Sequence, residues 1–262
     1  YQLTTGYEVP GIVGVAHKPQ ANMLKNVLAI NNKVVNFRKI KGISPETIPS
    51  FPWYQLVGEV QHLPQGFWPY IAGTQVHTLY LQNNDIGAEE AKKLAAALPS
   101  TQVHNLHLVD NPIGTEGVKK LAAALPSTQI CTLQLGINEI FAKGAKELAA
   151  ALPSTQIHTL YLESNQIGNQ GVKELAAALP STQIRNLYLG WNQIGDEGVK
   201  ELSAALPSTQ VHILHLNSNH IGKEGAKKLA ADLPSTQVHT LYLRGNQIGT
   251  GMKILLRQKN PH

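Results

Sequence analysis

The chain has 262 residues, 42% of them hydrophobic and 15% charged, and its formal net charge is +5. This composition is typical of one large or two small globular domains and excludes a disordered, collagen-like or disulfide-stabilised chain. A single cysteine and no Asn-x-Ser/Thr sequon favour a cytosolic protein. No apolar stretch approaches the roughly 20 residues that a membrane span requires. The chain begins at Tyr1 rather than Met, which is compatible with a further segment upstream.

Residues 1–73 lack the repeat that fills the rest of the chain, and we expect them to form an N-terminal capping segment with irregular and helical structure. They hold seven of the 15 prolines. Hydrophobic spacing predicts a helix over 21–30 and a second over 53–62, and 68–73 aligns with the end of a repeat helix. Trp53 and Trp68 are expected to be exposed, which would allow this segment to contribute to partner binding.

From residue 74 the sequence repeats every 27 residues without a slip, giving seven units that end at residue 262. The motif Leu-Pro-Ser-Thr-Gln returns at Leu98 and then in each following unit up to Leu233. A fixed period of this length indicates a solenoid of stacked supersecondary units. The last unit is more polar on its outer face and is predicted to be the C-terminal cap.

Each unit combines a strand pattern with a helix pattern. In the unit that starts at Thr182, alternating residues predict a short strand around Leu187, with Tyr188 on its outer face. Val199 and Leu202 begin a series at i, i+3, i+4 and i+7 that predicts one buried helix face. Adjacent strands lie about 4.8 Å apart and packed helices about 8–10 Å, so the stack should curve toward its strands.

The repeat resembles the ribonuclease-inhibitor type of leucine-rich repeat. It carries Leu-x-Leu-x-x-Asn-x-Ile followed by Gly-x-x-Gly-x-x-x-Leu, and its asparagine returns in every unit from Asn84 to Asn246. The resemblance implies an α/β solenoid or horseshoe, with parallel strands on the concave face, helices on the convex face, and asparagines that join neighbouring loops by hydrogen bonds. The nearly identical helices are also similar to those of leucine-rich repeat effectors of intracellular bacteria such as Legionella.

The units differ mainly in the strand and in the loop after it, whereas their helices hardly vary. An outward ladder of mostly aromatic residues follows the strands, and aromatic side chains are enriched at binding surfaces. Such a ladder can instead stabilise an exposed sheet without any partner. Ile137 and Trp191 are large apolar residues where other units carry small polar ones, and packing on the adjacent loop is their alternative role. The predicted partner-binding residues are Tyr80, His107, Ile137, Tyr161, Glu163, Arg185, Tyr188, Trp191, His215, Tyr242 and Arg244.

Nothing in the sequence predicts catalysis, a cofactor or a metal. No P-loop, nucleophile-elbow, His-Glu-x-x-His or Cys-x-x-Cys motif occurs. A second outward column is rich in histidine, but a row of side chains does not form the closed shell of a structural metal site. Its Cys131 lies beside His104 and His158, on an open sheet without a pocket to exclude water. Concave charges are few and mixed, which argues against nucleic-acid binding.

The sequence therefore predicts a non-enzymatic module that binds a folded protein on its concave face and is a monomer when free. The resemblance to ribonuclease inhibitor implies inhibition of an enzyme by covering its active site. The resemblance to bacterial effectors implies action in the cytoplasm, after secretion by a bacterium into the host cytosol, on a host protein or another effector. Two alternatives stay open. One is a regulator or activator of a host small GTPase, in which Arg185 or Arg244 would act, and the other is the recognition domain of a larger sensor.

Overall fold

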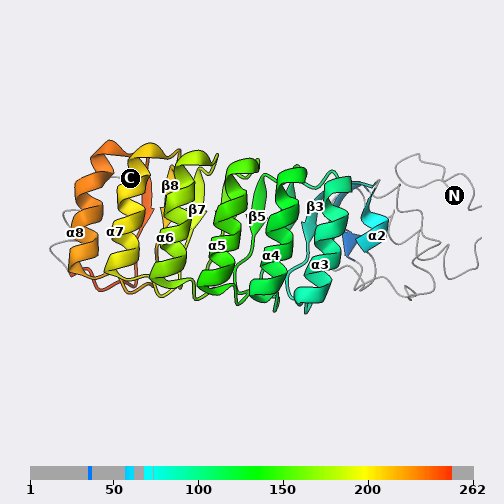
Figure 1. Cartoon of the computed structure of the whole chain (residues 1–262), viewed down its shortest axis with the longest axis horizontal. Coiled ribbons are helices and arrows are strands. Elements are labelled where there is room, and N and C mark those ends of the chain that lie inside the picture. Colours follow the sequence, from blue (N-terminus) through cyan, green and yellow to red (C-terminus); the bar gives the residue numbers. More distant parts are fainter. Residues whose placement is uncertain (1–34, 37–56, 62–67, 73, 250–262) are drawn as a thin grey trace, which may run out of the picture.

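In a computed structural model of the protein, the residues whose structure is described are 35–36, 57–61, 68–72 and 74–249. They form a solenoid with two layers (Figure 1): helices stand side by side along one layer, and strands lie behind them in a second layer. The described strands make one nine-stranded parallel sheet in the order β1 to β9. No described helix is long and apolar enough to cross a membrane.

The elements of one unit follow each other with little variation along the chain. The strands are β1 (Val35–Asn36), β2 (Val57–Gln61), β3 (Gln75–Tyr80), β4 (Asn105–His107), β5 (Thr132–Gln134), β6 (Thr159–Tyr161), β7 (Asn186–Tyr188), β8 (Ile213–His215) and β9 (Thr240–Tyr242). The helices are α2 (Trp68–Ile71), α3 (Ala88–Ala97), α4 (Gly114–Ala124), α5 (Phe141–Ala151), α6 (Gly168–Ala178), α7 (Asp196–Ala205) and α8 (Lys223–Asp232).

The core lies between the two layers and runs the length of the array. In the unit around β7 and α7, Leu187 of the strand and Val199, Leu202 and Ser203 of the helix are fully buried, as the spacing predicts. The same positions are buried in the neighbouring units, so each unit shares its apolar face with the next one. Because paired strands approach more closely than packed helices, the strand side is the concave side.

The recurring Leu-Pro-Ser-Thr segment closes each helix. Pro207 does not end the helical path at once, because Leu206–Ser208 continue α7 as a short 3-10 helix. The Thr209 hydroxyl then donates to the Leu206 carbonyl at 2.9 Å and accepts the Val211 amide at 3.3 Å. Proline begins the tight turn and threonine satisfies its last backbone groups, which explains why this motif is repeated so strictly.

A ladder of buried asparagines joins the loops of successive units. The Asn165 side-chain oxygen accepts the backbone N–H groups of Asn138 (2.9 Å) and Ile140 (3.3 Å) in the preceding unit. Its side-chain nitrogen donates to the carbonyls of Leu135 (2.7 Å) and Leu162 (3.0 Å). The side-chain oxygens of Asn111, Asn192 and Asn219 accept the equivalent pair of amides, so the role that the family resemblance implies for this asparagine is confirmed.

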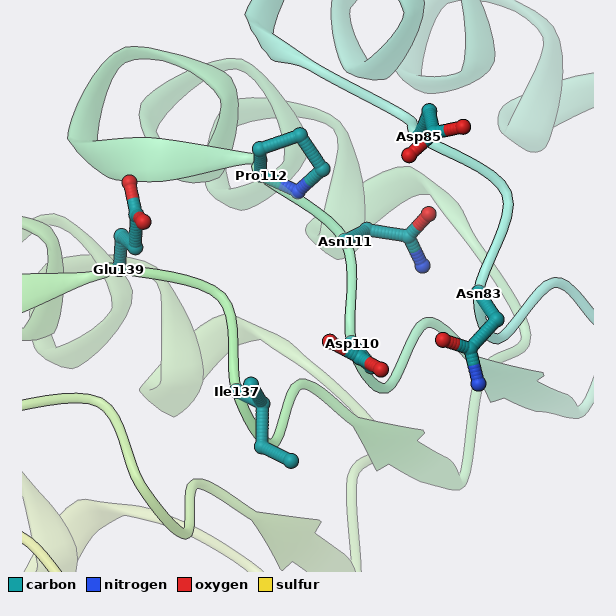
Figure 2. Close-up of a pocket in the computed structure, with 7 residues that line it drawn as sticks. All are labelled: Asn83, Asp85, Asp110, Asn111, Pro112, Ile137 and Glu139. Carbon is teal, nitrogen blue, oxygen red and sulfur yellow. The ribbon is translucent and has the colours of Figure 1, made fainter.

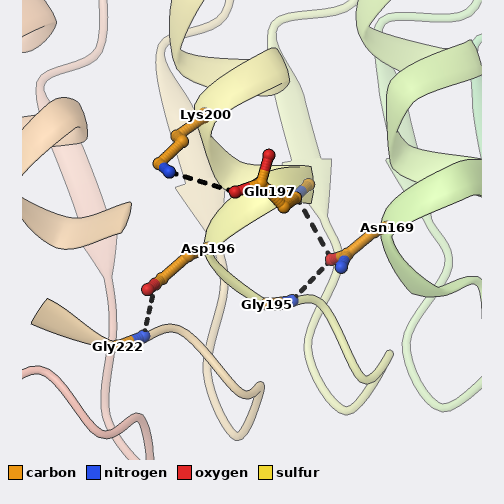
Figure 3. A network of polar contacts seen from close by, with 7 residues as sticks. Asn169, Gly195, Asp196, Glu197, Lys200 and Gly222 are labelled. Carbon is orange, nitrogen blue, oxygen red and sulfur yellow. Dashed lines mark hydrogen bonds and ion pairs between the residues drawn. The ribbon is translucent and has the colours of Figure 1, made fainter. Parts of the chain in front are cut away.

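Polar side chains at the start of some helices cap the helix of the following unit (Figure 3). The Asn169 side-chain oxygen accepts the N–H of Gly195 at 2.7 Å and that of Gly198 at 3.2 Å. One unit further, Asp196 accepts the N–H of Gly222 at 2.7 Å. Both acceptors satisfy amides that have no partner within their own helix, so capping in this part of the array acts between units.

Two expectations for the N-terminal segment are wrong. Val57–Gln61 form strand β2 rather than part of a helix, because they pair in parallel with β3 and extend the sheet. Trp68 is buried rather than exposed, and its indole N–H donates to Glu90 at 2.6 Å. The helix expected over 21–30, Trp53, and the end of the last unit after residue 249 lie outside the described residues.

Candidate functional site: the sheet face and its loop edge

The strands present a row of aromatic and polar side chains on the concave face. Strand pairing places Tyr80, His107, Gln134, Tyr161, Tyr188, His215 and Tyr242 in one row across β3 to β9. Four of their rings form a continuous stack, with centroids 4.0 Å apart for Tyr161–Tyr188, 4.3 Å for Tyr188–His215 and 3.8 Å for His215–Tyr242. Two more rings, Tyr80 and His107, lie 4.5 Å apart. We call this row the ring ladder.

Gln134 divides the ring ladder into two parts. It occupies the row position on β5, between His107 and Tyr161, and it has no ring. Tyr161 therefore has a ring partner on the β7 side and an amide side chain on the β5 side.

The stacked rings alter each other's proton affinity. Burial, together with hydrogen bonding to Tyr161 and the nearby Glu163 charge, raises the pKa of Tyr188 to about 12. Burial between Tyr188 and Tyr242 lowers the pKa of His215, because the surrounding rings disfavour the charged imidazolium. The stack is therefore an uncharged surface at neutral pH.

Glu163 is a half-buried carboxylate on the concave face. It belongs to the first variable column after the strand, where the flanking units carry Gly136 and Gly190. Its Oε2 lies 3.8 Å from the place that a Cβ on Gly136 would occupy, and its Cγ lies 3.6 Å from the corresponding place on Gly190. Burial raises the pKa of Glu163 to about 7, and a backbone hydrogen bond opposes this only in part. The uncharged acid is thus abundant at neutral pH.

The next column forms an edge of exposed loops in the left-handed backbone region. Its φ angles lie between 52° and 59° at the non-glycine positions. Three members, Asn83, Asp110 and Gly245, are residue types that tolerate this conformation. Ile137 (φ 56°) and Trp191 (φ 53°) are not, and they are 51% and 58% exposed. Large apolar side chains are therefore held in water on a strained backbone, an arrangement that clusters at functional sites.

Phe141 repeats this pattern and was missed by the sequence analysis. It occupies a position that is glycine in every other unit, adopts φ 57° and is 42% exposed. The signal that would have found it is its departure from a column of glycines. Phe141 is the first residue of α5, just after the loop that carries Ile137, so it adds a second exposed apolar group to this edge.

A shallow pocket of about 320 Å³ lies between the loops of the first three units (Figure 2). Carboxylates on three successive loops, Asp85, Asp110 and Glu139, line it together with Ile137. None of these three carboxylates takes part in an ion pair within the described part of the chain. This part of the loop edge is acidic, although the chain as a whole is basic.

The second outward column begins with His77 and ends with His239. Cys131 in this column makes one weak contact, from its Sγ to the Gln129 carbonyl at 3.5 Å. Within the described ranges, no group of His, Cys, Asp and Glu could hold a metal ion. Arg185 and Arg244 are both exposed and lie on different strand units, away from each other along the array.

The repeats identify the class of the protein. The residues 101–122, 154–176, 181–203 and 208–230 match a family model described as leucine rich repeat. With the 27-residue period and the parallel sheet, these matches show that the described repeats form a leucine-rich repeat solenoid, an architecture that typically serves as an interaction module. No curated protein matches the chain.

The solved structures that the chain matches include the leucine-rich repeat-containing protein LegL7 from Legionella pneumophila. It is 18% identical, the match covers 87% of this chain and 97% of that chain, and the TM-score is 0.40. A second is TLR13 in a complex with ssRNA13, which is 15% identical with a TM-score of 0.42. That match covers 83% of this chain and 35% of TLR13.

Proposed function

We propose that the protein binds a folded protein partner with its concave face and the adjoining loop edge, and that it has no catalytic activity of its own. The observation that carries this proposal is the exposure of Trp191 and Ile137 on strained backbone. Neither residue packs into the core, and each occupies a position where the remaining units carry smaller polar residues or glycine. Burying such a side chain against a partner contributes roughly 1.5–3 kcal/mol.

The ring ladder supports the same proposal, because it is a broad, rigid and uncharged surface at neutral pH. Tyrosine and tryptophan dominate the energetics of protein interfaces, and rigid side chains lose little conformational freedom on binding. We propose inhibition of an enzyme as the mode of action, since an extended sheet face can cover the entrance of an active site. The ribonuclease-inhibitor type of repeat and the role as a bacterial effector rest on sequence resemblance.

The test is affinity capture from host lysate and, separately, from bacterial lysate, followed by mass spectrometry. The wild type is compared with a variant that carries Trp191→Ala, Tyr161→Ala and Tyr188→Ala. A matched control carries three exposed changes on the helix side, Lys119→Ala, Lys146→Ala and Lys227→Ala. We expect a protein that the wild type and the control retain and the concave variant loses. Equal capture by all three folded proteins would contradict binding by the concave face.

Inhibition is tested on the captured partner, if it is an enzyme, by measuring turnover with increasing amounts of the repeat protein. We expect turnover to fall to zero at saturation with the wild type and to be unchanged with the concave variant. Delivery into host cells is a separate question, answered by fusing the chain to a translocation reporter in a bacterial donor.

A further inference from the structure

The middle of the concave face combines a carboxylate, a ring that stacks on another ring on one side only, and two positions without side chains. Glu163 supplies the carboxylate and Tyr161 supplies the ring. Gly136 and Gly190 lie on either side of Glu163 in the neighbouring units. From these contacts we infer that this place, which we call the Glu163 notch, receives an arginine side chain of the protein partner. The inference deepens the proposed function and rests on it, because it specifies the chemistry of the partner.

Gly136 is not required by the backbone, whereas a Cβ at Gly190 would lie 3.3 Å from the Asn217 carbonyl oxygen. Neither Gly136 nor Gly190 has a positive φ, and other units place Gln82, Val109 or Asn217 in the same column. At Gly136 a Cβ would meet its nearest neighbours at 3.5–3.8 Å, which is ordinary van der Waals contact. The fold would therefore accept a side chain at this position. Because Gly136 has no side chain, the space beside Glu163 is free on that side. Its width is the distance between adjacent strands, about 4.8 Å.

Glu163 has no cation of its own. None of the ion pairs among the described residues involves it, and no charged group opposes the effect of burial on its pKa. A partly desolvated carboxylate without a counter-charge is costly, and a cation from outside would remove that cost. Glu163 is thus a carboxylate without an ion-pair partner on the surface that we propose binds the partner protein.

Tyr161 makes arginine a better ligand than lysine. Its ring stacks on Tyr188 at 4.0 Å and 12° on one side, while Gln134 follows on the other side. A planar guanidinium can stack on a tyrosine ring and at the same time donate two parallel hydrogen bonds to a carboxylate. Glu163 lies two residues after Tyr161 on the same chain segment, so both groups are within reach of one guanidinium.

Binding of a cation should grow stronger as pH rises through 7, since the ligand requires the charged form of Glu163. The other titratable groups that face the notch are Tyr161 and Tyr188, and beyond them His215 and Tyr242 in the same stack. The pKa of Tyr188 is raised to about 12, and burial lowers the pKa of His215, so neither group opposes the effect.

The test uses the full chain labelled with ¹³C at the glutamate carboxyls and two small probes. N-acetyl-arginine methylamide carries the guanidinium, and N-acetyl-citrulline methylamide replaces it with a neutral urea of similar shape. We expect the arginine probe to shift the Glu163 resonance saturably in the millimolar range and to lower the midpoint of its titration. The citrulline probe should bind at least tenfold more weakly.

Three variants make the result specific. Glu163→Gln should abolish the preference for arginine over citrulline, and Gly136→Gln should block the notch while keeping the carboxylate. Glu116→Gln removes an exposed carboxylate on the helix side and should change nothing. Equal binding of the two probes, a preference that survives Glu163→Gln, or no shift up to about 100 mM arginine probe would overturn the inference. The capture experiment is independent of these probes, so the proposed function can stand if the notch fails.

Discussion

Pro112 leaves the side-chain oxygen of Asn138 buried without a hydrogen-bond donor. In most units the residue at the Pro112 position has φ near +55°, as in Asp85 (53°) and Glu139 (54°), and the next amide donates to the asparagine ladder. Proline is fixed near −65° and cannot adopt that angle. The Ile113 amide therefore donates to the Asn111 carbonyl at 2.9 Å, and the Asn138 oxygen remains unpaired.

Pro112→Gln should restore this step of the ladder. Glutamine occupies the equivalent position in several other units and accepts a positive φ, so the amides of Asn111 and Ile113 could turn toward Asn138. The gain from pairing the buried oxygen is about 1–3 kcal/mol, partly offset by about 0.4–1 kcal/mol for the freer unfolded chain. We expect a net stabilisation of about 1 kcal/mol in urea unfolding. A loss of stability would show that the loop is held by other contacts.

The ladder asparagines should contribute unequally to the free energy of unfolding. Asn165→Ala removes an oxygen that two buried amides use, whereas Asn138→Ala removes an oxygen that none uses. Both changes lose the donations from the side-chain nitrogen. We expect Asn165→Ala to lower the free energy of unfolding by about 1–3 kcal/mol more than Asn138→Ala. Denaturation curves of the two variants under identical conditions measure this gap, and equal losses would refute it.

Gly171→Ala tests how closely the helices pack. Helix propensity alone predicts a gain of about 1 kcal/mol for alanine in the interior of α6. The added Cβ, however, would overlap Ile167 Cγ2 and lie 3.1 Å from the Cα of Ala142 on α5. Overpacking of this kind costs about 1–3 kcal/mol. We expect net destabilisation, measured as a lower thermal midpoint, and the exposed Gln170→Ala is the matched control.

Trp191→Asn should separate binding from stability. Asparagine tolerates the left-handed region, which costs other L-residues about 1–2 kcal/mol. The tryptophan is 58% exposed and contributes little burial to the fold. We expect the variant to be as stable as the wild type or up to about 1 kcal/mol more stable in guanidinium unfolding, while its capture of the partner weakens. Marked destabilisation would mean that Trp191 packs on its neighbouring loops instead.

Glu163→Gln should change the pH dependence of stability. Folding raises the pKa of this carboxyl from 4.5 to about 7, so the folded state holds the proton more tightly, and stability falls as pH rises from about 4.5 to 7. Glutamine imitates the protonated acid at every pH. We expect the variant to match the wild type at pH 4 and to exceed it by about 2 kcal/mol at pH 8, allowing for partial exposure. A constant difference across this range would refute the assignment.

Much of this arrangement was predictable because the repeat imposes it. The 27-residue period, the leucines that face inward and the unbroken asparagine column predict a parallel sheet with helices on its other side. They also predict the ring ladder, since strand pairing without a register shift brings equivalent residues into one row. The exposure of Ile137 and Trp191 was predictable as well, because each departs from its column.

Other features depend on contacts that no single unit contains. Local spacing predicts a helix over 53–62, yet pairing with β3 makes Val57–Gln61 a strand, because a free sheet edge satisfies its backbone groups. Trp68 is buried by the packing of α2 against α3, not by its own segment. The unpaired oxygen of Asn138 depends on Pro112 in the unit before it.

The sequence by itself determined the repeat, its core and the row of rings, since these follow from periodic burial within each unit. Only the tertiary structure decided where that regularity breaks. Glu163 lies half-buried beside the glycines of the two flanking units, and the exposed Phe141 begins α5 just after the loop that carries Ile137. These properties depend on contacts between units. The residues involved are about 27 positions apart in the sequence but lie on adjacent strands.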